Sequence, residues 1–140
     1  MSRTGVRTSA IIIKDNKILL MHRKKNGKEY WVFPGGGVED TETAKEGIIR
    51  EVKEETNLEV TKCNLAFMAY NEASQKDEPF YFCEVTDGTP EIVGEERDKH
   101  SPENWYHLEW VKLNKIKDIY LVPENAAQKV VQNYSRQKRV

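Results

Sequence analysis

The sequence predicts an α/β domain in which a mixed sheet is packed between helices. Short β-branched and apolar segments separated by polar turns indicate strands in both halves of the chain. Two segments with helical periodicity and clear start signals lie far apart, one near the middle and one near the C-terminal end. At 140 residues, the chain is most simply one domain spanning residues 1–140.

The first quarter of the chain is predicted to begin with a β-hairpin. Residues 6–13 and 17–22 are β-branched and apolar, and residues 14–16 supply the turn between these two strands. The polar segment 24–29 is expected to be a loop.

A glycine run follows the next predicted strand. Residues 31–33 form a short strand that stops at Pro34. Gly35, Gly36 and Gly37 then make available backbone conformations that other residues disfavour, so the sequence predicts a glycine-rich turn.

The first helix is predicted over residues 44–56. Thr43 and Glu46 match a capping box, and Asn57 is suited to the left-handed residue that ends a helix. A packing stripe should face the sheet, and its members are Ala44, Ile48 and Val52.

The remainder of the chain is predicted to hold three strands and a final helix. Pro123 fits the first turn of that helix, over residues 124–134. The strands are expected at residues 58–70, as one long strand or a bent pair, and at 79–85 and 105–113, with an irregular charged segment at 91–104.

Charge and cysteine content exclude several classes. The 22 basic and 23 acidic residues give a formal charge of -1, which does not indicate a dedicated nucleic-acid binder. Cys63 and Cys83 show no metal-site spacing and are expected to be buried thiols. The apolar runs are too short to span a bilayer, and the N-terminus lacks a signal-peptide core. We therefore expect a cytoplasmic protein that makes no membrane contact.

Three glutamates of the first helix are candidates for metal binding. Glu51, Glu54 and Glu55 are spaced i, i+3 and i+4, so their side chains emerge as neighbours on one face. Clustered carboxylates repel one another, whereas hard divalent cations require such oxygen ligands. These residues could bind Mg²⁺, with one glutamate left to accept a proton from an attacking water. Taken without the rest of the motif, the three glutamates are also compatible with an acidic helix face that is simply exposed to solvent.

An arginine on the same helix is expected to hold the glycine-rich segment against the helix. Arg50 should project away from the carboxylate face and pair with Glu42. The helix N-terminus adds N–H donors near the glycines, a combination that favours bound phosphates. The sequence contains no P-loop, dinucleotide-binding or serine or cysteine nucleophile motif.

The complete pattern Gly36-x5-Glu42-x7-Arg50-Glu51-Val52-x-Glu54-Glu55-x-Asn57-Leu58 resembles the Nudix box of the Nudix (MutT-like) hydrolases. Residues 31–39 also resemble the usual approach to that box. The resemblance implies a Nudix-like α/β/α sandwich with a mixed sheet. It also implies Mg²⁺- or Mn²⁺-dependent hydrolysis of a nucleoside diphosphate linked to another moiety. Asn57 replaces the family's glycine, and asparagine is the next-best left-handed cap.

The resemblance also assigns roles by position. Glu51 and Glu55 match the principal metal ligands, and Glu54 matches a further ligand or the general base. Arg50 matches the residue that orients the catalytic glutamate, with Glu42 as its partner. The family does not fix which glutamate is the base, and some members use a backbone carbonyl that corresponds to Gly35 as a metal ligand.

Further contacts are expected outside the helix. The family often adds an acidic ligand from a later loop, for which the candidates are Glu95, Glu96 and Glu103. Arg23, at the end of a strand, and the glycines Gly36 and Gly37 are candidates to bind substrate phosphates, although Arg23 is equally compatible with an exposed strand end.

Aromatic residues and histidines give weaker signals. Trp31 and Phe33 are expected in the core, whereas Tyr81, Trp105 and Tyr106 are compatible with base stacking or packing. The three histidines show no ligand spacing and are expected at the surface or in satisfied contacts; they are His22, His100 and His107.

The leading functional hypothesis is a hydrolase that converts a nucleoside triphosphate, or a modified relative, into a nucleoside monophosphate and pyrophosphate. ADP-ribose, dinucleoside polyphosphates and the 5′ end of RNA are alternative substrates, and that RNA end is the one nucleic-acid partner considered. A non-catalytic nucleotide-binding regulatory module and a structural domain are the competing classes. The intact carboxylates argue against the module, and the full spacing of the motif argues against the structural domain. A homodimer is compatible with the sequence, which does not determine the oligomeric state.

Overall fold

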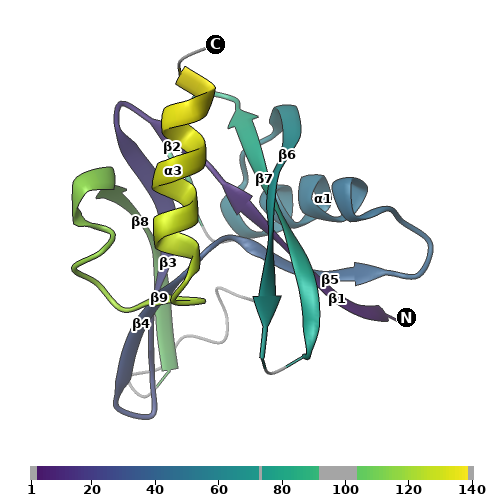
Figure 1. Cartoon of the computed structure of the whole chain (residues 1–140), viewed down its shortest axis with the longest axis horizontal. Coiled ribbons are helices and arrows are strands. Elements are labelled where there is room, and N and C mark those ends of the chain that lie inside the picture. Colours follow the sequence, from purple (N-terminus) through teal and green to yellow (C-terminus); the bar gives the residue numbers. More distant parts are fainter. Residues whose placement is uncertain (1–2, 73, 92–103, 139–140) are drawn as a thin grey trace.

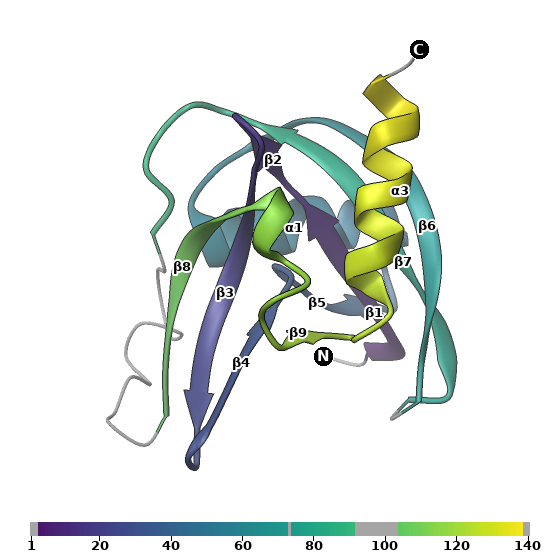
Figure 2. The ribbon, with the colours of Figure 1, turned by 60° about the vertical axis from the view of Figure 1, so that its left-hand side comes forward.

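The computed structural model describes residues 3–72, 74–91 and 104–138. Two helices, α1 (Ala44–Thr56) and α3 (Ala126–Lys138), lie on opposite sides of the strands (Figure 1; Figure 2). The predicted α/β sandwich with mixed sheets is therefore confirmed. The other elements are β1 (Arg3–Ile11), β2 (Ile13–Lys14), β3 (Lys17–Lys25), β4 (Lys28–Val32), β5 (Gly35–Glu39), β6 (Val60–Asn71), β7 (Lys76–Val85), β8 (Asn104–Lys112), η1 (Leu113–Lys115) and β9 (Leu121–Val122).

Both sheets contain parallel and antiparallel pairs. The four-stranded sheet has the order β5-β1-β7-β6, with β1 and β7 parallel and the other pairs antiparallel. In the five-stranded sheet, β3 pairs antiparallel with β2, β4 and β8, and β9 adds parallel to β4. Figure 2 shows β3 between β8 and β4.

The N-terminal hairpin differs from its prediction in two respects. The single strand expected over residues 6–13 is interrupted at Ile12, so β1 joins one sheet and β2 the other. The loop expected over residues 24–29 is instead a tight turn, since Lys25 pairs with Lys28. Asn26 and Gly27 adopt φ values of 52° and 81°, as a two-residue hairpin turn requires.

The glycine run is a strand, and the predicted glycine-rich turn is wrong. Gly36 pairs with Thr8 across the antiparallel β1–β5 ladder. A Cβ atom on Gly35 would collide with the backbone carbonyl oxygen of Thr8. Glycine is therefore needed here because two backbones approach closely.

The later elements agree with their predictions except at their ends. Strands β6, β7 and β8 begin or end within about three residues of the expected positions. Helix α3 begins at Ala126, whose backbone N–H bonds to the carbonyl of Pro123, so the helix starts two residues later than predicted. Most of the segment expected to be irregular, residues 92–103, lies outside the described residues. Among the described residues, no helix has the length and apolar character needed to cross a membrane.

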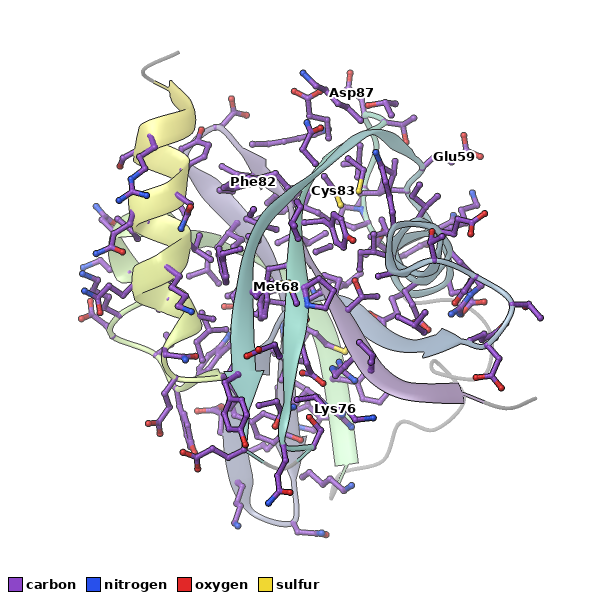
Figure 3. The ribbon with its side chains drawn as sticks, turned by 45° about the vertical axis from the view of Figure 1, so that its right-hand side comes forward. Glu59, Met68, Lys76, Phe82, Cys83 and Asp87 are labelled. Carbon is purple, nitrogen blue, oxygen red and sulfur yellow. The ribbon has the colours of Figure 1, made fainter. Side chains whose placement is uncertain are left out.

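The core has two parts, one under each helix. Ile48 and Val52 of α1 pack with Cys63 and Cys83, whereas α3 covers a cluster that includes Phe33. Figure 3 shows that Phe82 and Cys83, neighbours on β7, point to opposite layers. The Sγ atoms of Cys83 and Cys63 lie 3.9 Å apart as free, buried thiols, as the sequence predicted.

Candidate functional site

The site is built on α1, whose bounds agree with the sequence prediction. The Thr43 hydroxyl accepts a hydrogen bond from the Glu46 N–H at 3.1 Å, and the Glu46 carboxylate accepts one from the Thr43 N–H at 2.8 Å. At the other end, Asn57 adopts the predicted left-handed conformation with φ of 61°. Because both ends are capped, the carboxylates of this helix have defined positions relative to the sheet.

Arg50 connects the helix to the glycine strand, as predicted. Its Nε and Nη2 atoms donate to the two carboxylate oxygens of Glu42 at 3.1 and 2.6 Å, which is a bidentate contact. Nη2 also donates to the Gly37 carbonyl at 3.1 Å, and the Glu39 N–H donates to Glu42 at 2.9 Å. The guanidinium therefore holds β5, the residues before α1 and the helix itself together.

Arg50 does not point away from the acidic face, and that expectation is wrong. Its Nη1 atom donates to Glu51 at 2.9 Å and lies 3.3 Å from a Glu54 oxygen. The long side chain folds back across its own helix because the fork of donors can serve Glu42 and the acidic face together. The hydrogen bond to Glu42, followed by the bond to Glu51, raises the pKa of Arg50 above its ordinary value, so the group stays charged.

Two glycines of β5 make room for two of the carboxylates. The Gly35 N–H donates to a Glu55 oxygen at 2.9 Å. A Cβ atom on Gly36 would lie only 2.5 Å from the carboxyl carbon of Glu51. Glu51 is only 7% exposed, so its carboxylate is packed against bare backbone. The glycine strand therefore determines where these two carboxylates lie.

The residue types present suit a hard divalent cation. However, among the described residues only His22, His107 and Glu109 already bring three ligand atoms within 4.8 Å of one another, so the glutamates of α1 would have to converge when an ion binds. Arg50 pairs with three carboxylates, those of Glu42, Glu51 and Glu54, so negative charge is in excess around the single guanidinium, and Glu55 adds a fourth carboxylate that is bonded to the Gly35 N–H. Oxygen donors with unbalanced negative charge are the ligand set that Mg²⁺ and Mn²⁺ prefer. The Glu54 side chain is 59% exposed, so this end of the acidic face is open to solvent.

Arg23 lies on the other sheet, and no described contact joins it to α1. Its guanidinium carbon is 5.2 Å from the ring centroid of Tyr106 and 6.0 Å from that of Tyr30. Among the described residues its Nε atom is buried without a hydrogen-bond partner. The role of Arg23 in binding phosphate stays a prediction, as do the phosphate contacts of Gly36 and Gly37.

The structure tests the predictions for two aromatic residues but not those for the later acidic ligand. Phe33 and Tyr106 are buried in the core, with exposed fractions of 2% and 1%. The candidates for a later acidic ligand, Glu95, Glu96 and Glu103, lie outside the described residues.

The sequence interpretation missed a cluster on β3 and β8. His22 and His107 are directly paired across these strands, and Glu109 contacts both side chains. The separation of these residues along the chain concealed them, because only the strand pairing brings them together. A predicted β3–β8 register would have been the signal that reveals the cluster.

Comparisons with known proteins identify the family and the fold. A family model described as the NUDIX domain matches residues 3–129. An ADP-ribose pyrophosphatase from Methanocaldococcus jannaschii is 54% identical over 55 residues, which is 39% of this chain and 32% of that protein. An 8-oxo-dGTP diphosphatase from Proteus vulgaris is 36% identical over 62 residues, which is 43% of this chain and 55% of that protein.

A solved structure gives the same fold over a longer alignment. The MutT protein from Methanosarcina mazei Go1 superposes with a TM-score of 0.70 at 22% identity, covering 95% of this chain and 94% of that one. The matched segments of the two curated relatives span 32% and 55% of their lengths, so their similarity concerns part of each protein.

Proposed function

The chain belongs to the NUDIX family, and from that membership we propose that it hydrolyses a diphosphate linkage in a nucleoside polyphosphate with the help of Mg²⁺ or Mn²⁺. The observation that supports this proposal most directly is the carboxylate cluster on α1. Glu51 and Glu55 lie against the glycine strand, and Arg50 joins Glu42, Glu51 and Glu54. These contacts support the proposal that Arg50 and Glu42 position the glutamates of α1.

Three glutamates would hold the metal: Glu51, Glu54 and Glu55, with the Gly35 carbonyl as a further candidate ligand. When bound, such a metal neutralises phosphate charge, polarises phosphorus and lowers the pKa of a bound water. Arg50 orients the carboxylates, and Glu42 fixes the guanidinium. Glu54 is our choice for the general base because it is exposed enough for a water molecule to reach it.

The proposed substrate is a nucleoside triphosphate or a modified relative. Water forms a new P–O bond, the bridging bond between the α- and β-phosphates breaks, and the proton of the water passes to the base. The products are a nucleoside monophosphate and pyrophosphate. Arg23 and the backbone of Gly36 and Gly37 are proposed to contact the phosphates.

The relatives define the alternatives that must be tested. One is named for ADP-ribose and the other for 8-oxo-dGTP, so both compounds belong in a substrate panel with canonical triphosphates. Dinucleoside polyphosphates and triphosphorylated RNA complete the panel. The free thiols of Cys63 and Cys83 fit a reducing compartment, which supports a cytoplasmic location.

The experiment is hydrolysis of this panel with Mg²⁺, with Mn²⁺ and with a chelator, followed by chromatographic separation of the products. Repeating the reaction in ¹⁸O-labelled water locates the attack, because the label enters whichever product contains the attacked phosphorus. We expect metal-dependent formation of a monophosphate and pyrophosphate. Release of only orthophosphate and a diphosphate would contradict the assigned bond cleavage, and absence of any turnover would favour the binding-module alternative.

A further inference from the structure

The pairing of β3 with β8 assembles two histidines and a glutamate on one face of the five-stranded sheet. His22 is opposite His107 in the register, and Glu109 is two residues further along β8. Residues two apart on a strand point to the same face, so the side chains of His107 and Glu109 are neighbours. The cluster belongs to β3 and β8, whereas the acidic site is built on α1 and β5.

The two distances to Glu109 are close to those between ligand atoms of a bound transition metal. Oε2 of Glu109 lies 3.0 Å from Nδ1 of His22 and 3.3 Å from Nε2 of His107. The three candidate ligand atoms all lie within 4.8 Å of one another. Tetrahedral zinc with bonds of about 2.0 to 2.1 Å separates its ligand atoms by roughly 3.3 Å. The two histidine nitrogens lie within the 4.8 Å limit, and the exposed His107 ring can turn to bring its nitrogen to the spacing that zinc requires.

A second carboxylate contacts the other ring nitrogen of His22, as is common for histidines that bind a metal. The other ring nitrogen, Nε2, lies 3.1 Å from Oε2 of Glu29 on β4. A neutral imidazole has one donor nitrogen and one acceptor nitrogen. When Nε2–H donates to Glu29, Nδ1 presents its lone pair to the Glu109 carboxylate, and a cation between those two atoms satisfies both. A carboxylate on the second nitrogen is the common outer partner of a metal-bound histidine.

Aromatic rings hold the two histidines in place. The His22 ring stacks on Trp31 with centroids 4.1 Å apart and planes 11° apart. The His107 ring stacks on Trp105 at 5.1 Å, and Trp105 also meets His22 edge-on at 5.0 Å. The His22 side chain is only 12% exposed, whereas those of His107 and Glu109 are 51% and 37% exposed. The cluster is therefore constrained on one side and open to an incoming ion on the other.

We propose that His22, His107 and Glu109 form a site for a Zn²⁺-class transition metal, separate from the acidic site on α1, with Glu29 orienting His22. Two imidazoles with one carboxylate suit zinc, copper or nickel, whereas Mg²⁺ prefers oxygen ligands alone. The bound ion would link β8 to β3, so it is expected to raise the thermal stability of the protein rather than to change its turnover.

Zinc chloride is the probe for this site. Tag-free full-length protein is titrated calorimetrically in millimolar Mg²⁺, which competes for the carboxylates of α1. We expect one zinc ion per chain and a thermal midpoint that rises with zinc. His107→Gln should weaken binding by at least about tenfold and Glu29→Gln by about tenfold, the range found when ligands or their outer partners are lost. Because His107 is exposed, its replacement should leave the fold intact, which circular dichroism checks.

Two matched variants test the assignment. Glu55→Gln removes a carboxylate of α1, and His100→Gln removes the third histidine; both should bind zinc as the parent does. X-ray absorption at the zinc edge should show scattering from imidazole rings. Equal zinc affinity in the parent and His107→Gln would overturn the proposal and leave the cluster as an ion-pair network only. Loss of zinc binding in Glu55→Gln or in His100→Gln would assign the ion elsewhere.

Discussion

Replacing Gly36 by alanine should disable the site by displacing one carboxylate. The new Cβ atom would lie 2.5 Å from the Glu51 carboxyl carbon and 2.6 and 2.7 Å from its two oxygens. Ordinary contact begins near 3.4 Å, so the carboxylate must retreat by about 0.9 Å. Glu51 is buried and bonded to Arg50, which leaves it little room to move sideways. A misplacement of about 1 Å costs on the order of 100-fold in rate, or about 2.7 kcal/mol of barrier.

The assay is kcat at saturating Mg²⁺ on the best substrate of the panel, corrected for the folded fraction. Gly36 has no positive φ, so alanine should fit its backbone, and any loss reflects the steric contact with Glu51. Gly27→Ala is the matched control, because its φ is +81° and nothing lies within 4 Å of its Cβ position. That control should lower stability by about 1 kcal/mol through backbone strain and leave kcat unchanged. A folded Gly36→Ala enzyme with the parent kcat would refute the reasoning.

Two further substitutions test the positioning of α1. Arg50→Lys keeps the charge but cannot reproduce the bidentate contact with Glu42 while also reaching Glu51, so kcat should fall about tenfold in steady-state assays. A fully active variant would contradict the positioning role of Arg50. Thr43→Ala removes one half of the capping box and should reduce the free energy of unfolding by about 1 kcal/mol in urea, with kcat per folded molecule retained. Unchanged urea stability would show that the Thr43–Glu46 cap contributes little.

Local signals were sufficient to predict α1 and much of its chemistry. The capping box at Thr43 and the left-handed Asn57 depend on residues a few positions apart, so the helix bounds could be predicted closely. The pairing of Arg50 with Glu42 follows from the same short range. The contact of Arg50 with Glu51 was missed, because helical spacing describes where a side chain leaves the helix and not where a long one ends.

Features that depend on strand pairing could not be predicted from local sequence. Gly35 and Gly36 look like turn residues, but they serve a strand that passes close to β1 and to Glu51. The break at Ile12 is also a tertiary effect, since β1 and β2 join different sheets. Likewise, His22 and His107 meet only because β3 pairs with β8.

The most direct test of the account is the turnover of Glu55→Gln at saturating Mg²⁺. Glutamine can still accept the hydrogen bond from Gly35, which Glu55 accepts at 2.9 Å, so the fold should persist while the proposed metal site loses a charge. Glu59→Gln is the matched control, because this exposed carboxylate lies beyond the end of α1 (Figure 3). We predict that kcat of Glu55→Gln falls at least about tenfold, or about 1.4 kcal/mol, whereas Glu59→Gln retains the parent value. Equal kcat in Glu55→Gln and the parent would contradict a metal-dependent active site on this face of α1.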